Sequence, residues 1–178
     1  MTLVLLAVCL LALVISATTA LALVEVYEGL RQVRQISGLD DVPQDIPLTT
    51  VGTAASALGL DDFFPLDAGI LLFLSPRCAT CHTIADSFGG SVPDQTHVVI
   101  TATDGLTARR WAQDYGLPDP RVTFDDSQAL ADQIGIDSTP SAVMVHQGMV
   151  ARAATVPSRR VLDELLREAR SGMREVQP

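Results

Sequence analysis

Hydrophobic and polar positions divide the chain into an apolar N-terminal run and a later region where short apolar runs alternate with amphipathic segments. Residues 1–24 contain no charged side chain and reach the roughly 20 apolar residues that are needed to cross a membrane. A cleaved signal peptide would have a basic start and a shorter apolar core. We therefore expect a transmembrane anchor at residues 1–24, a juxtamembrane helix and linker at residues 25–50, and one folded domain at residues 51–178.

Short apolar runs in the domain are typical of strands that are buried on both faces, and each is followed by a helical pattern that ends at a glycine. The predicted strands are residues 69–74, 97–102 and 121–124, and the predicted helices are residues 78–88, 106–116 and 125–135. Strands and helices that alternate in this way predict βαβ units with parallel pairing.

The last part of the domain shows a different pattern. Residues 141–146 and 149–156 are two extended runs around Gln147-Gly148, which predicts a β-hairpin with antiparallel pairing. Residues 158–172 carry one apolar stripe, so we expect a final helix that covers the sheet. The predicted fold is α/β, with a mixed sheet of βαβ units, a C-terminal hairpin and a helix, preceded by one transmembrane helix.

Composition and charge exclude several classes of function. The 12 basic residues are all arginine and face 21 acidic ones, which gives a net charge of −9 and argues against nucleic acid or an anionic lipid surface as a partner. A chain without lysine cannot form a Schiff base through a lysine side chain. The sequence contains no glycine-rich phosphate loop, so the candidate chemistry lies in the segment Cys78-Ala-Thr-Cys81-His82.

The two cysteines of this segment have the spacing of a reactive dithiol. Cys78 begins a predicted helix, where the free N–H groups and the helix dipole stabilise a thiolate and lower its pKa below about 8.5. Cys81 follows one turn later in a more enclosed position, which suits a resolving thiol in disulfide exchange. Arg77 and a protonated His82 would favour the thiolate through their positive charge, whereas the alternative for His82 is an exposed ring without a role.

A C-x-x-C pair at a strand-to-helix junction, followed by Thr139-Pro140 and a hairpin, resembles a thioredoxin-like domain over residues 51–169. Together with the apolar N-terminus, the motif FLSPRCATC resembles the membrane-tethered TlpA-like proteins and the MauD-type methylamine-utilisation accessory proteins. The resemblance implies a thiol-disulfide oxidoreductase that needs no cofactor or metal. Its partners would be client proteins with cysteines or disulfides and a redox partner protein.

The same resemblance implies a binding role for Thr139 and Pro140. It places a cis Thr139-Pro140 bond beside the cysteine pair, so that the backbone of Thr139 can pair with an extended client segment. The chain departs from common thioredoxins in having Leu72 in place of a buried acid and Arg77 in place of tryptophan. A proton relay and a redox potential therefore do not follow from the resemblance.

Three alternatives to disulfide exchange use the same residues. Cys-x-x-Cys-His is also the attachment motif of c-type haem, with His82 as the proximal ligand and Met144, Met149 or Met173 as the distal one. A structural zinc site needs four ligands, whereas the chain offers one cysteine pair with His97 and His146 elsewhere. The third alternative is a redox-inactive interaction module with a permanent Cys78–Cys81 disulfide.

We predict that the domain lies outside the cytoplasmic membrane of a bacterium as part of a single-pass protein, as the resemblance implies. Arg31 and Arg34 follow the apolar run and favour the opposite orientation under the positive-inside rule. A membrane-impermeant thiol reagent added to intact cells should therefore label Cys78. Labelling that occurs only after lysis would place the domain on the cytoplasmic side.

Overall fold

The computed structural model describes residues 16, 18–19, 41–60, 63, 68–117 and 120–174, which fall into two compact units, residues 1–40 and 41–178. In the first unit, Ser16, Thr18 and Thr19 are helical, and the Thr19 hydroxyl donates a hydrogen bond of 2.9 Å to the carbonyl oxygen of Ser16. The rest of the expected anchor and juxtamembrane helix lies outside the described residues. None of the helices that the structure describes is long and apolar enough to cross a membrane.

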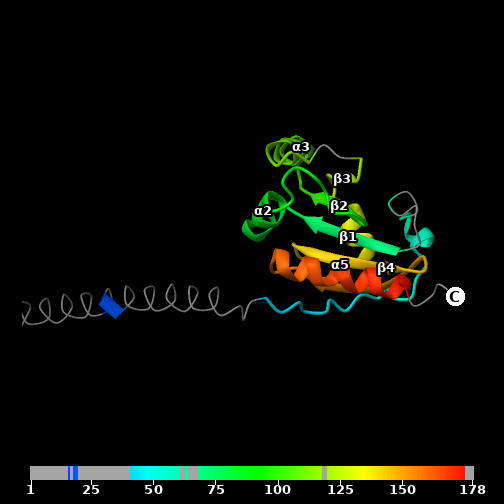
Figure 1. Cartoon of the computed structure of the whole chain (residues 1–178). Helices are drawn as coiled ribbons and strands as arrows, with labels where there is room; N and C mark the ends of the chain where they lie inside the picture. Colours follow the sequence, from blue (N-terminus) through cyan, green and yellow to red (C-terminus); the bar gives the residue numbers. More distant parts are fainter. Residues whose placement is uncertain are drawn as a thin grey trace, which may run out of the picture. The chain divides into compact units, whose positions relative to one another are not determined.

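The second unit is built on a mixed five-stranded sheet with the order β3-β2-β1-β4-β5 (Figure 1). The first three strands pair in parallel, and β4 and β5 pair antiparallel, β4 with β1 and β5 with β4. This arrangement confirms the predicted βαβ units and hairpin. The strands are β1 (Ala68–Leu74), β2 (Thr96–Thr101), β3 (Val122–Asp125), β4 (Ser141–His146) and β5 (Met149–Thr155).

Helices cover both faces of this sheet. The face that each helix covers follows from the order in which the chain passes through the strands. The chain moves steadily from β1 to β2 to β3, so two right-handed crossovers place α2 and α3 on the same face. The return from β3 to β4 crosses in the other direction and carries α4 over the opposite face. The helical elements are η1 (Ala55–Leu58), α2 (Ala79–Asp86), α3 (Gly105–Asp114), α4 (Ala129–Ile134) and α5 (Arg159–Arg174).

The alternation of side chains along β1 divides the core into two clusters. Ile70, Leu72 and Leu74 pack with buried residues of α2, α3 and α5 on one face. Leu71 and Phe73 pack with η1 and α4 on the other. Every residue of β1 and β2 is buried, as their apolar runs predict, and the amphipathic α5 lies against the sheet beside β4 (Figure 1).

Residues 44–54 run along the outer edge of β5 and belong to the same unit. The backbone N–H of Ile46 donates to the carbonyl oxygen of Ala153 at 2.9 Å. Arg152 on β5 joins Asp45 at 2.6 Å and Glu168 of α5 at 3.2 Å. These contacts cover the edge of the sheet, which an unpaired strand would leave open to other chains.

Helix α4 is short and depends on a carboxylate from the strand before it. Its N-cap residue, Gln128, has a φ of 60° and makes no side-chain cap hydrogen bond. The buried carboxylate of Asp125 accepts hydrogen bonds from the N–H groups of Leu130 at 3.2 Å and Ala131 at 3.0 Å. The Asp125 carboxylate therefore caps α4 and holds the start of this helix against the end of β3.

We predict that Asp125→Ala destabilises the folded chain by about 1–3 kcal/mol, because the two N–H groups lose their acceptor in a buried position. Chemical denaturation of the full-length chain measures this loss. The matched control is Asp126→Ala, whose carboxylate is exposed and lies 4.0 Å from Arg109; its effect should stay within about 0.5 kcal/mol. Equal losses in the two variants would show that the capping carboxylate contributes nothing specific.

Candidate active site

Cys78 lies where the central strand β1 passes into helix α2. It is the N-cap residue, with φ −102° and ψ 115°, and its Sγ accepts a hydrogen bond of 3.2 Å from the N–H of Cys81. The N–H of Cys78 itself donates to the carbonyl oxygen of Ser75 at 3.1 Å. The prediction that Cys78 begins this helix is therefore confirmed, and its sulfur takes the place of a capping oxygen.

The second contact of Cys78 comes from a residue 61 positions later in the chain, because its Sγ lies 3.4 Å from the carbonyl oxygen of Thr139. Thr139 follows α4, which covers the opposite face of the sheet, and it directly precedes Pro140 and β4. The Thr139-Pro140 peptide bond is cis, as expected. The structure thus brings together Cys78, Cys81 and the backbone of Thr139, three of the predicted site residues.

The two cysteines, both free thiols in this structure, differ sharply in environment. Cys78 is half-buried, whereas Cys81 is completely buried. Burial raises the pKa of Cys81 to about 12, helped by the hydrogen bond and the charge of Cys78 and opposed by hydrogen bonds with Ser75 and Thr139. Cys81 is therefore the thiol that keeps its proton, and Cys78 is the one that an incoming molecule can reach.

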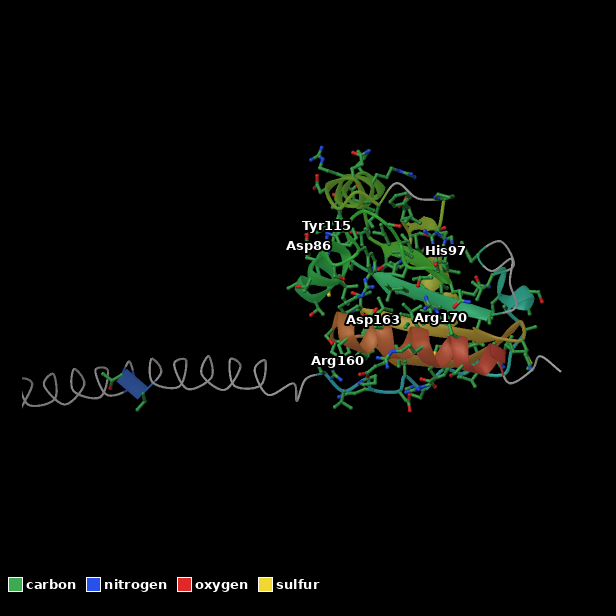
Figure 2. All side chains as sticks on the ribbon, in the orientation of Figure 1. Asp86, His97, Tyr115, Arg160, Asp163 and Arg170 are labelled. Atoms are coloured by element: carbon green, nitrogen blue, oxygen red, sulfur yellow. The ribbon has the colours of Figure 1, made fainter. Side chains whose placement is uncertain are left out.

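Arg77 and His82 do not lie as an exposed cationic pair beside the thiol. Arg77 is exposed, and its guanidinium donates to the Thr103 hydroxyl at 3.4 Å. His82 is half-buried, with its Nε2 2.7 Å from the carbonyl oxygen of Pro76 and its Nδ1 2.7 Å from the hydroxyl of Tyr115. Tyr115, labelled in Figure 2, lies where α3 ends close to α2.

Trp111 completes this cluster by donating its indole N–H to Nδ1 of His82 at 3.2 Å. The Trp111 side chain is buried in the core, with an exposure of 5%. Sequence reasoning missed its bond to His82 and the role of Tyr115. No pattern along the chain signals either contact, because both depend on how α3 packs against α2.

The alternative chemistries find less support in this geometry. Both ring nitrogens of His82 are already hydrogen-bonded, and Cys81 is buried, so neither offers an open position for haem attachment. His97 lies on β2 with its Nε2 2.8 Å from the Thr123 hydroxyl, and His146 lies on β4. Within the part of the chain that the structure describes, no three histidine, cysteine or acidic side chains are grouped as metal ligands.

Surface hollows adjoin the residues around Cys78. One of about 320 Å³ is lined by Ser75, Ser138 and Thr139, among others. Another of about 410 Å³ is lined by Pro76, Trp111 and Leu106, whose side chain is 79% exposed. Both hollows therefore share a wall with the loop that carries Cys78 or with the segment that touches its sulfur.

The sheet order, the C-terminal hairpin and the cysteine pair after β1 are those of a thioredoxin-like fold. No protein-family model matches the chain, and no curated protein matches it significantly. Similar solved structures include a secreted Mycobacterium tuberculosis disulfide oxidoreductase homologous to Escherichia coli DsbE, with 16% identity and a TM-score of 0.48, covering 68% of this chain and 94% of that one.

Two further structures are similar to this chain at the same level. A secreted thiol-disulfide isomerase from Corynebacterium glutamicum shares 19% identity with a TM-score of 0.43, covering 58% of this chain and 71% of that one. StoA from Bacillus subtilis shares 16% identity with a TM-score of 0.40, covering 55% and 81%.

We predict that the two thiols react with iodoacetamide at very different rates near pH 8. In a Cys81→Ser variant, Cys78 should be alkylated readily, because its sulfur is accessible. In a Cys78→Ser variant, Cys81 should react at least about tenfold more slowly, because a buried thiol with a raised pKa supplies little thiolate. Mass spectrometry of the peptide that contains both positions measures the rates, and equal rates would contradict the assigned order.

Proposed function

We propose that the chain catalyses thiol-disulfide exchange with client proteins, with Cys78 as the nucleophile and Cys81 as the resolving thiol. The observation that carries this proposal is the position of Cys78. Its half-buried sulfur caps α2, lies against the carbonyl oxygen of Thr139 and has the buried Cys81 one turn behind it. A redox-inactive module would not need one accessible and one enclosed thiol.

The exchange is a pair of substitutions at sulfur. The Cys78 thiolate attacks one sulfur of a client disulfide, which forms a mixed disulfide and releases the other client sulfur as a thiolate. The Cys81 thiolate then attacks Sγ of Cys78, which releases the second client thiolate and leaves a Cys78–Cys81 disulfide. The client gains two electrons and the pair loses two; the reverse sequence oxidises a client dithiol.

The second step requires Cys81 to lose its proton, and the causes of its raised pKa explain when it does so. Two of these causes, the hydrogen bond and the charge of Cys78, disappear once Cys78 is in a mixed disulfide. The pKa of Cys81 should then fall, although burial still raises it. Leu72 stands where many thioredoxins have a buried acid, so the released client thiolate is the proton acceptor in this scheme.

Thr139 and Pro140 are proposed to bind the client. The carbonyl oxygen of Thr139 already lies beside the attacking sulfur, so an extended segment that pairs with this backbone would hold its disulfide close to Cys78. In this proposal the hollows of about 320 Å³ beside Thr139 and about 410 Å³ beside Trp111 receive client side chains near the disulfide under attack.

The cellular setting forms part of the proposal and rests on the sequence. Residues 1–24 would tether the chain to the cytoplasmic membrane, with the domain on the outer side, as in the TlpA-like and MauD-type proteins. A separate redox partner protein would restore the cysteine pair after each turnover. The reversible chemistry of the pair accommodates a partner that either reduces or oxidises it.

We predict that a Cys81→Ser variant accumulates mixed disulfides through Cys78, because the resolving thiol that would release the client has been removed. Non-reducing electrophoresis of the tagged full-length chain should show adducts that a reductant dissolves. A Cys78→Ser variant is the matched control and should show far fewer. Adducts that form only through Cys81 would reverse the two roles, and the absence of adducts in both variants would contradict the proposed function.

A further inference from the structure

The ring of His82 connects helix α2, helix α3 and the loop before Cys78. His82 lies one turn after Cys78, and side chains on a helix lean toward its N-terminus, so the imidazole reaches back over Ser75–Arg77. The ring meets Trp111 at a centroid distance of 5.5 Å and Tyr115 at 5.6 Å, in edge-on arrangements. Trp111 and Tyr115 also contact each other at 5.0 Å, so the imidazole is held on its α3 side.

The partners of the two ring nitrogens determine where the imidazole carries its hydrogen. The indole N–H of Trp111 donates to Nδ1 of His82 at 3.2 Å, and the Tyr115 hydroxyl lies 2.7 Å from the same nitrogen. The carbonyl oxygen of Pro76 can only accept, so Nε2 must donate. These partners fit the Nε2–H tautomer, in which Nδ1 accepts and Nε2 donates.

The bond to Pro76 bears directly on the reactive sulfur. The carbonyl oxygen of Pro76 lies 2.7 Å from Nε2 of His82, and the N–H of Arg77 in the same peptide donates to the Ser75 hydroxyl at 3.4 Å. Cys78 follows two residues later, and its sulfur must meet both the N–H of Cys81 and the carbonyl oxygen of Thr139. A loop that is free to shift would misplace this sulfur, and misplacement by about 1 Å can cost a factor of 100 in rate.

We propose that His82 is the positioning residue of the cysteine pair: its ring, oriented by Trp111 and Tyr115, fixes the Pro76 peptide and thereby the sulfur of Cys78. This inference rests on the proposed function, which it deepens. His82 acts on Cys78 through the loop and takes no part in bond formation. Its charge is not used, so a neutral side chain with one donor and one acceptor in similar places should replace it.

The test compares variants of the full-length chain in a Cys81→Ser background. Mass spectrometry follows alkylation of the peptide that contains Cys78, because Cys9 is also present in the chain. His82→Ala should slow alkylation of Cys78 by iodoacetamide by about tenfold. His82→Gln should recover most of the rate, because its amide oxygen can accept from α3 while its amide nitrogen donates to Pro76. Tyr115→Phe, which removes one hydroxyl, should give an intermediate rate even if His82→Ala fails to fold.

His146→Gln on β4 is the matched control and should leave the rate unchanged, because this histidine belongs to no part of the site. Tryptophan fluorescence gives a separate readout, since Trp111 is the single tryptophan and loses its acceptor in His82→Ala. A His82→Gln variant as slow as His82→Ala would overturn the inference in favour of a charged histidine. Equal alkylation in His82→Ala and its parent would overturn it as well.

The alkylation readout also separates this inference from the proposed function. Iodoacetamide reacts with Cys78 whether or not the protein exchanges disulfides. The proposed function is tested by mixing the otherwise unaltered full-length chain, with Cys78 and Cys81 both present, with a peptide disulfide. A chain that fails to exchange while His82→Ala still slows alkylation would refute the function and keep the positioning role. Normal disulfide exchange, together with an alkylation rate that His82→Ala leaves unchanged, would keep the function and refute the positioning role.

Discussion

The hydrogen bond from the N–H of Cys81 to the sulfur of Cys78 fixes the reactive atom to the backbone at the start of α2. A helix leaves its first N–H groups without partners, and here a thiol takes the place of the usual oxygen. Cys81 and Ile84 hold the inner face of α2 in the core against β1, so the first turn cannot slide along the sheet. The position of the Cys78 sulfur is thus set by the buried inner face of α2 and by the backbone N–H of Cys81.

The other side of the site depends on the path of the chain around the sheet. Thr139 reaches Cys78 only because the chain returns from the edge strand β3 across the opposite face and enters β4 next to β1. Helix α4, held by the carboxylate of Asp125, sets where this return begins. The edge strand β3 and the centre of the sheet are linked in this way. The reactive sulfur therefore lies between the start of α2, which packs on one face of the sheet, and Thr139, which follows a helix on the opposite face.

The helices and strands could be predicted well from the sequence, because buried apolar positions follow the pattern that each kind of element requires. The all-apolar run of β1, the glycines that end the helices and the alternation of strands and helices could be recognised without coordinates. Cys78 and Cys81 could be recognised as well, since their spacing alone places them one turn apart. The contacts of His82 with Pro76, Trp111 and Tyr115 could not, because they join α2 to α3 and depend on side-chain packing that no local pattern encodes.

The asymmetry of the two thiols is produced mainly by backbone groups and by burial. Arg77 directs its guanidinium to Thr103, the ring of His82 bonds to Pro76, Tyr115 and Trp111, and Leu72 is fully buried. The N–H of Cys81 donates to the Cys78 sulfur at the start of α2, whereas burial raises the pKa of Cys81. Because both effects come from the helix start and the core, they persist when the side chains around the motif change.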